Sequence, residues 1–146
     1  MICGLGGRDV IRGLRGDDLL IGGDGSDRLL AGPGDDHVTA GYDHDVVHGG
    51  RGGDRIGGGP DGDLLVGDAG DDAARGGQGQ DRVSGGSGRD IVIGGKGGDE
   101  CLSSFDGVDG NDLVRTGVGH DHAYADPGDR VAPPAESTGP CSAPVS

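Results

Sequence analysis

The stretch GGDGSDRLLAGPGDDHVTAGYDHDVVHGG, residues 22–50, repeats one chemical pattern at a fixed spacing of nine residues. Asp27, Asp36 and Asp45 carry the pattern, and an aliphatic residue follows each of them two positions later. Glycine fills most of the positions that precede each aspartate. A fixed short period predicts identical structural units that stack on one another, because no single unit of this size can bury its own apolar face.

The same period extends over most of the 146-residue chain. Aspartate recurs every nine residues from Asp9 to Asp99, and after a slip of four residues the period resumes at Asp112 and Asp121. With this aspartate as the sixth position of each nonapeptide, the fourth position is Gly in eleven of thirteen repeats and the eighth is apolar in all thirteen. The consensus is therefore G-G-x-G-x-D-x-U-x, where U is hydrophobic. Its aspartates are Asp9, Asp18, Asp27, Asp36, Asp45, Asp54, Asp63, Asp72, Asp81, Asp90, Asp99, Asp112 and Asp121.

The composition excludes several classes of protein. Thirty-seven glycines, one Phe and no Trp do not suit a conventional core of large side chains. The net charge of −14 disfavours binding to nucleic acid, and no apolar run approaches the ~18 residues of a membrane span. All acidic residues except Glu100 and Glu136 are aspartates, whose short side chain keeps the carboxylate close to the backbone. Such a bias favours a site built from carboxylates together with backbone carbonyls.

The nonapeptide itself predicts a solenoid of short strands. Glycine at the first, second and fourth positions favours a turn with positive φ angles, and the following x-U-x triplet is expected to form a short strand. Two nonapeptides make one coil of turn, strand, turn and strand, and successive coils lie about 4.8 Å apart, as parallel strands do. We therefore predict an all-β parallel roll with two short-stranded sheets. The eighth-position side chains form its thin core, and the aspartates line its two edges.

Stacked aspartates require a counter-ion. Carboxylates about 5 Å apart repel one another by about 1 kcal/mol per pair even at the dielectric constant of water. Ca²⁺ suits such an edge, because it accepts about six to eight oxygens in flexible geometry, whereas Mg²⁺ prefers a rigid octahedron and softer metals prefer other ligands. The thirteen aspartates are therefore candidate ligands of several Ca²⁺ ions, together with the backbone carbonyls of the glycine-rich turns. Folding should then be coupled to calcium binding.

The thirteen motifs closely resemble the RTX family of hemolysin-type calcium-binding repeats over about residues 1–132. The segment CGLGGRDVIRG, residues 3–13, is similar to actinobacterial members of this family. The resemblance implies a right-handed parallel β-roll with two nonapeptides in each 18-residue coil. It also implies that the sixth-position aspartates and the turn carbonyls bind calcium, and that extracellular calcium triggers folding.

The chain divides into segments by its repeat register. Arg130 stands nine residues after Asp121, so the fourteenth repeat is expected to be degenerate. Met1–Cys3 fill only the last third of a nonapeptide, so we expect this chain to be a fragment that continues upstream, with its secretion signal outside it. The segments are repeats over 1–102, an inserted loop over 103–106, further repeats over 107–132 and a disordered Pro/Ser-rich tail over 133–146.

Some residues depart from the consensus. Asp43 and Asp61 replace glycine at the fourth position, either as additional ligands or because aspartate tolerates left-handed backbone geometry. The fifth-position aspartates are expected to be outer or solvated charges, and the five histidines to be exposed polar residues. These aspartates are Asp17, Asp35 and Asp71.

The three cysteines are not expected to form an internal disulfide. Cys3 and Cys101 lie about five coils apart, roughly 24 Å at the strand spacing, and Cys141 is in the tail. Their role is left open.

The pattern favours a non-enzymatic, calcium-stabilised extracellular module with a structural or accessory role. The alternative is the C-terminal calcium-binding part of a larger secreted enzyme or toxin, whose catalytic domain would lie upstream. The zinc-protease motif H-E-x-x-H does not occur in the sequence. A carbohydrate-binding surface is disfavoured, because Tyr42 and Tyr124 are too few and too far apart for an aromatic row. A protein or carbohydrate partner is otherwise left open.

Overall fold

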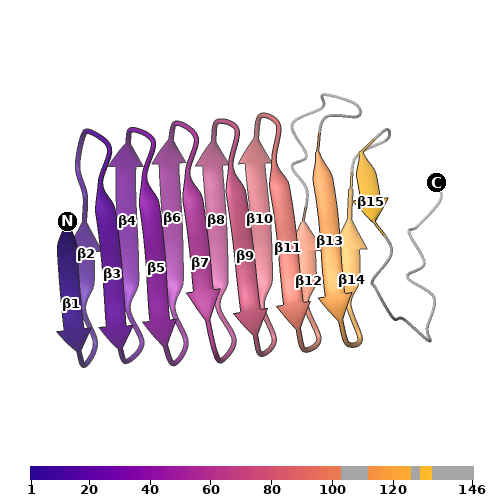
Figure 1. Cartoon of the computed structure of the whole chain (residues 1–146), viewed down its shortest axis with the longest axis horizontal. Coiled ribbons are helices and arrows are strands. Elements are labelled where there is room, and N and C mark those ends of the chain that lie inside the picture. Colours follow the sequence, from indigo (N-terminus) through magenta and orange to yellow (C-terminus); the bar gives the residue numbers. More distant parts are fainter. Residues whose placement is uncertain (103–111, 126–128, 133–146) are drawn as a thin grey trace.

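The structure is a computed structural model that describes residues 1–102, 112–125 and 129–132. Within these ranges every regular element is a β-strand, and successive strands alternate between two parallel sheets (Figure 1). The odd-numbered strands form one eight-stranded sheet and the even-numbered strands form one seven-stranded sheet. The predicted inserted loop over 103–106 and the predicted tail over 133–146 lie outside the described residues.

The strands follow the sequence in strict alternation. The eight-stranded sheet consists of β1 (Ile2–Gly6), β3 (Leu19–Asp24), β5 (His37–Tyr42), β7 (Arg55–Gly59), β9 (Ala73–Gln78), β11 (Ile91–Lys96), β13 (Leu113–Val118) and β15 (Arg130–Ala132). The seven-stranded sheet consists of β2 (Val10–Arg12), β4 (Arg28–Pro33), β6 (Val46–Arg51), β8 (Leu64–Ala69), β10 (Arg82–Ser87), β12 (Glu100–Leu102) and β14 (His122–Tyr124).

The register of the strands follows the period of the sequence. Leu20 pairs with Val38 in one sheet and Leu29 pairs with Val47 in the other, a separation of two nonapeptides in each case. This pairing confirms the predicted parallel roll with two repeats per coil. After the four-residue slip the ladder continues in register, because Val92 pairs with Val114.

The strands are longer than the predicted x-U-x triplet. The strand β3, for example, runs from Leu19 to Asp24, so it includes the first three positions of the next nonapeptide. Gly23, at the second of these positions, pairs with Gly41 of β5 within the ladder. The prediction of three-residue strands was therefore wrong: the Gly-Gly-x segment is part of the sheet, and the turn shrinks to the fourth, fifth and sixth positions.

The glycines serve two different purposes. Gly23 at the second position and Gly25 at the fourth have φ angles of 114° and 112°, which favour glycine. A Cβ on Gly23 would also collide with the carbonyl oxygen of Leu5, one coil earlier. Gly22 at the first position, in contrast, has no left-handed φ angle. The prediction of positive φ at all three glycine positions is therefore corrected for the first position, where glycine provides space.

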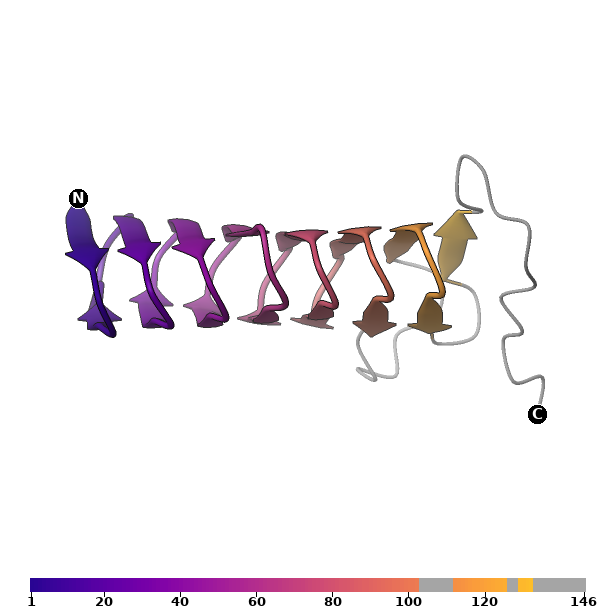
Figure 2. The ribbon, with the colours of Figure 1, turned by 90° about the horizontal axis from the view of Figure 1, so that it is seen from below.

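The core lies between the two sheets, which form two layers along the solenoid (Figure 2). Eighth-position side chains from both layers meet there, and Leu20, Leu29 and Leu65 have no exposed surface. The first position also faces inward, as buried Ala31 and Ala40 show where alanine replaces glycine. The predicted aliphatic core is confirmed, and its narrow width keeps the two lines of turns close to the apolar interior.

Candidate metal centres

The sixth-position aspartates lie in the turns between the sheets, along two opposite edges of the roll. The turns that leave the eight-stranded sheet carry Asp9, Asp27, Asp45, Asp63, Asp81, Asp99 and Asp121. The turns that leave the seven-stranded sheet carry Asp18, Asp36, Asp54, Asp72, Asp90 and Asp112. The structure thus brings alternate aspartates together at one edge, as the register predicts.

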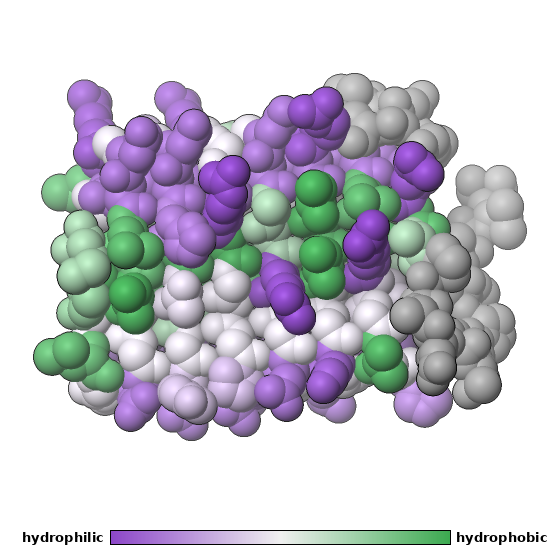
Figure 3. Space-filling view, in the orientation of Figure 1, coloured by the Kyte–Doolittle hydropathy of each residue, from purple (hydrophilic) through white to green (hydrophobic). Residues whose placement is uncertain are grey.

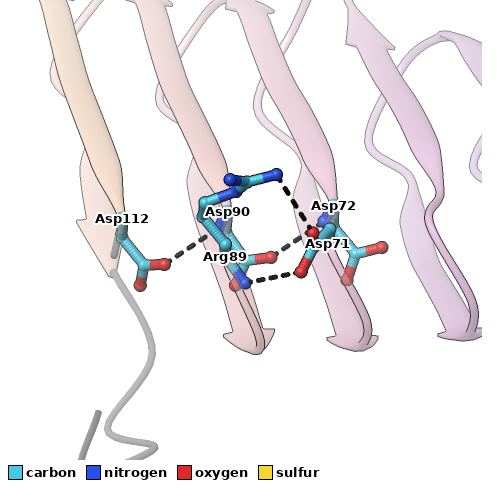
Figure 4. A network of polar contacts seen from close by, with 5 residues as sticks. All are labelled: Asp71, Asp72, Arg89, Asp90 and Asp112. Atoms are coloured by element: carbon cyan, nitrogen blue, oxygen red, sulfur yellow. Dashed lines mark hydrogen bonds and ion pairs between the residues drawn. The ribbon is translucent and has the colours of Figure 1, made fainter. Parts of the chain in front are cut away.

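From Asp27 onward, one carboxylate oxygen of each stacked aspartate accepts a hydrogen bond from the backbone of the preceding coil. Asp27 Oδ1 accepts a hydrogen bond from the Asp9 N–H at 2.8 Å, and Asp63 Oδ1 accepts one from the Asp45 N–H at 2.9 Å. The same bond crosses the four-residue slip, where Asp112 Oδ1 accepts from the Asp90 N–H at 2.8 Å (Figure 4). Each edge is therefore a ladder in which every aspartate after the first binds the turn of the preceding coil.

The second carboxylate oxygen, Oδ2, is buried and has no hydrogen-bond partner among the described residues at nine of these positions. A buried anionic oxygen without a partner costs several kcal/mol, which a bound cation or a proton would offset. The repeat pattern predicts that the aspartates lie in the turns. It does not predict that Oδ1 accepts a hydrogen bond while Oδ2 is left without a described partner. The nine residues are Asp9, Asp27, Asp36, Asp45, Asp54, Asp63, Asp72, Asp81 and Asp99.

Backbone carbonyl oxygens lie close to these unpaired carboxylate oxygens. A Cβ added to Gly4 would lie 2.6 Å from Asp9 Oδ2 and would also meet the carbonyl oxygen of Gly22. A Cβ added to Gly94 would likewise meet Asp99 Oδ2, at 2.6 Å, and the carbonyl oxygen of Thr116. A carboxylate oxygen and a carbonyl oxygen therefore converge on these first-position glycines, where a Cβ would collide with both.

This donor set fits calcium. Both donors are hard oxygen atoms, and Ca²⁺ accepts mixtures of carboxylate and carbonyl oxygens in flexible geometry. Within the described ranges, no three side chains of His, Cys, Asp or Glu come together as a metal-binding group. A cation at an edge would therefore take many of its ligands from the backbone, which suits calcium better than zinc or copper.

When no cation is bound, burial destabilises the ionised form of these carboxylates in the folded roll. Burial is the largest cause of the raised pKa values of Asp63 and Asp72, the hydrogen bond from the preceding coil opposes it, and the charge of the neighbouring aspartates adds to it. The pKa rises to about 7 for Asp63 and Asp72, and to about 6 for Asp45, Asp54 and Asp81. The strongest perturbation thus lies at the centre of the stack.

The fifth-position aspartates hold the turns from outside. Asp17, Asp35 and Asp71 are exposed, as expected. However, Asp17 Oδ1 accepts a hydrogen bond from the Asp35 N–H at 3.0 Å, and Asp71 Oδ1 accepts one from the Arg89 N–H at 3.0 Å. The Arg89 guanidinium also contacts Asp71 Oδ2 at 3.4 Å (Figure 4). These aspartates therefore bind the following coil, whereas the sixth-position aspartates bind the preceding one.

The two fourth-position aspartates take left-handed geometry. Asp43 and Asp61 have φ angles of 72° and 77°, and both are exposed. The Asp43 N–H donates to Asp61 Oδ2 at 3.3 Å. The observed backbone agrees with the interpretation that aspartate is tolerated here in place of glycine. The neighbouring His44 is exposed too, with Nδ1 2.6 Å from the carbonyl oxygen of Gly62.

Two further residues, Asp129 directly before β15 and Thr116 within β13, were not found by counting nine residues. Asp129 Oδ1 accepts the Asp112 N–H at 3.2 Å, and Arg130 pairs with Leu113. Asp129 therefore takes the sixth position of the fourteenth repeat, and the assignment of Arg130 to that position was wrong. The order Asp129, Arg130, Val131 repeats the D-x-U pattern one residue early. Thr116 occupies a first position, is fully buried, and has no described hydrogen-bond partner for Oγ1.

Cys3 is a free, exposed thiol. The side chain of Cys101 and all of Cys141 lie outside the part of the chain that the structure describes, so their predicted state stays a prediction.

Comparison with known proteins supports the identification of the repeat. No curated protein matches the chain significantly. The model of the RTX calcium-binding nonapeptide repeat family spans four copies of the repeat. It matches residues 4–38, 21–56, 30–65, 57–92, 66–101 and 106–129. Together these matches cover most of the chain, including the two lines of aspartates described above. The chain therefore belongs to the RTX calcium-binding nonapeptide repeat family.

Proposed function

We propose that this protein binds several calcium ions along the two edges of its β-roll, and that calcium drives its folding. The thirteen sixth-position aspartates supply the carboxylate ligands, and the carbonyl groups of the glycine-rich turns supply the rest. The observation that carries the proposal is the row of buried Oδ2 atoms without a partner among the described residues. Membership of a calcium-binding repeat family supports the same identity for the ion.

The coupling between folding and calcium follows from the balance of forces in the roll. The core contains only one or two aliphatic side chains per repeat, so the hydrophobic contribution per residue is small. Each coil also buries two carboxylates, which oppose folding because their charge is removed from water. A cation at each pair of turns stabilises the folded state by an amount that the unfolded chain cannot match, because the site exists only after folding.

The proposed setting is outside the cell, where the protein would serve as a structural or accessory module without a catalytic role. Extracellular calcium modules have dissociation constants of about 10⁻⁴–10⁻³ M, so they fill only where calcium is abundant. The repeats of this family are calcium-binding structural elements, which supports this assignment. Over the described ranges the structure contains no helix long and apolar enough to cross a membrane.

Isothermal titration of the chelator-treated protein with calcium tests the proposal. We expect more than one Ca²⁺ per chain, with a midpoint in the sub-millimolar to millimolar range, and no comparable heat from Mg²⁺ at the same concentration. Asp54→Asn should reduce the stoichiometry or weaken binding, because Asp54 Oδ2 is one of the buried oxygens without a described partner. Equal binding of both ions, or a single bound ion, would contradict the proposed sites.

A further inference from the structure

The outer face of the eight-stranded sheet carries a groove that the calcium sites do not use. Its volume is about 870 Å³, and it crosses the strands from β5 to β15. Figure 3 views this face, where a pale band runs along the solenoid between hydrophobic and hydrophilic side chains. The groove lies on the face of the sheet and borders one line of turns, because Gln78 and Lys96 end their strands directly before the turns that carry Asp81 and Asp99.

Register explains the shape of the groove. Its floor is the row of second-position glycines, which pair in sequence across neighbouring strands as Gly59, Gly77, Gly95 and Gly117. Their left-handed φ angles and the carbonyl groups of the preceding coils exclude a side chain there. Ninth-position residues form one wall and third-position residues form the other, so a long trough results wherever these side chains are large.

The side chains of the walls give the groove a charge opposite to that of the protein. Arg75 and Arg115 stand in one wall and Lys96 in the other, and all three are exposed. No acidic residue lines the groove, and none occurs in the described strands β5, β7, β9, β11, β13 and β15. No ion pair described for the structure involves these three cations. The chain has a net charge of −14, so this face carries a local excess of positive charge that the overall composition does not explain.

The opposite sheet lacks this arrangement. Asp68 interrupts the corresponding row of second-position glycines there, and its carboxylate lies 3.2 Å from His48 Nδ1. Arg82 on the same sheet pairs with Glu100 at 2.8 Å. The cations of the seven-stranded sheet are thus partly neutralised by acidic neighbours, and its glycine floor is broken.

We propose that this groove binds a linear acidic polysaccharide, whose carboxylates contact Arg75, Lys96 and Arg115. The spacing of the cations supports an extended polyanion, because Arg75 and Arg115 flank Ile93 in one register row and therefore stand about 10 Å apart. Thr39 and Gln78 in the walls can hydrogen-bond to sugar hydroxyl groups. The absence of aromatic residues from the groove means that charge, rather than ring stacking, provides the affinity.

An acidic peptide fits the groove less well. Side chains on one face of an extended peptide recur about every 6.8 Å, which does not match the separation of the two arginines. The strands of the floor already pair with their neighbours on both sides, so a peptide cannot add to them as another strand. Nucleic acid would bring a denser row of phosphates toward the two acidic edges, which repel it.

Binding of galacturonate oligomers, chosen too short to gel with calcium, tests the proposal. Titrations are made at low ionic strength in calcium buffer, and circular dichroism confirms that each variant is folded. The groove variant is Arg75→Gln/Lys96→Gln/Arg115→Gln. The matched control is Arg12→Gln/Arg28→Gln/Arg51→Gln, which removes the same charge from exposed positions of the seven-stranded sheet.

We expect the groove variant to bind about tenfold more weakly or worse, because each of the three exposed charge pairs contributes about threefold, and we expect the control to bind as the native chain does. Added salt should weaken native binding, and neutral dextran should not bind. Equal losses in both variants would overturn the proposal, as would tighter binding of polyglutamate or oligothymidylate. If the triple variant does not fold, Arg75→Gln and Arg115→Gln alone should each weaken binding about threefold, and unchanged affinity would refute the site. Folding in calcium is measured separately, so failure here leaves the proposed calcium function standing.

Discussion

Asp63→Asn should have opposite effects on the calcium-free and the calcium-bound protein. Asp63 lies near the middle of one edge and is 3% exposed. Its Oδ1 accepts the Asp45 N–H at 2.9 Å, and its Oδ2 is buried without a described partner. Asparagine keeps the first bond and removes the charge. Its amide group can also donate toward the carbonyl oxygen of Gly76, which converges with Oδ2 beside Gly58.

The size of the effect follows from the raised pKa of Asp63. Burial, the largest cause, raises this pKa from 3.8 to about 7, which corresponds to on the order of 4 kcal/mol of penalty on the ionised carboxylate at alkaline pH. Because a buried amide also costs free energy, we expect Asp63→Asn to stabilise the calcium-free roll by about 2 kcal/mol, or about thirtyfold in the folding equilibrium. With calcium, loss of an anionic ligand should raise the calcium midpoint on the order of tenfold.

Two titrations at pH 7.5 separate these effects. In chelator, trimethylamine N-oxide is added until the β signal appears, because this osmolyte favours the compact state. In chelator, Asp63→Asn should fold at a lower osmolyte concentration than the native chain. Without chelator or osmolyte, it should need more calcium to fold. Asp61→Asn is the matched control, since Asp61 lies in the same turn, is exposed, and has a left-handed φ angle that asparagine tolerates. A variant that folds worse in chelator and equally well in calcium would refute the reasoning.

Three further predictions follow from the same geometry. The calcium-free chain should be more stable at pH 5 than at pH 7.5, measured by osmolyte titration: the pKa values of Asp63 and Asp72 are raised to about 7, so the folded state binds more protons and gains stability as pH falls through that value. Stability independent of pH would contradict this. Leu65→Asp should abolish calcium-induced β structure, because Leu65 is fully buried, whereas Leu64→Asp on the outer face should be tolerated; equal calcium midpoints would count against the core. Asp54→Ala should weaken calcium-induced folding far more than Asp129→Ala, because a central defect interrupts the stack and a terminal one shortens it; similar midpoints would contradict the register.

Much of this architecture was predictable, because the nine-residue period translates directly into strand register. The eighth-position core and the two lines of aspartates required only that Leu20 lie over Val38, two repeats later. The length of the strands could not be predicted in the same way. Glycine is a poor strand former in general, and only the ladder between Gly23 and Gly41 places the Gly-Gly-x segment in the sheet.

The register of the fourteenth repeat and the groove on the eight-stranded sheet could not be predicted from the sequence. Counting nine residues from Asp121 reaches Arg130, whereas in the structure Asp129, 17 residues after Asp112, takes the place in the ladder. Arg75 and Arg115 can both be assigned to ninth positions from the sequence. Their common row with Ile93, and the trough beside it, depend on the glycine floor and on which sheet each strand joins.

The central claim is tested most directly by far-ultraviolet circular dichroism and small-angle X-ray scattering of the whole chain in chelator, calcium and magnesium. In chelator at pH 7.5 the chain should be expanded and largely without β structure, because the buried carboxylates of the two edges oppose folding. Calcium at about 10⁻⁴–10⁻³ M should produce a compact, β-rich rod, and magnesium at the same concentration should not. A β spectrum and a compact shape that persist in chelator, or that magnesium restores equally well, would contradict the account.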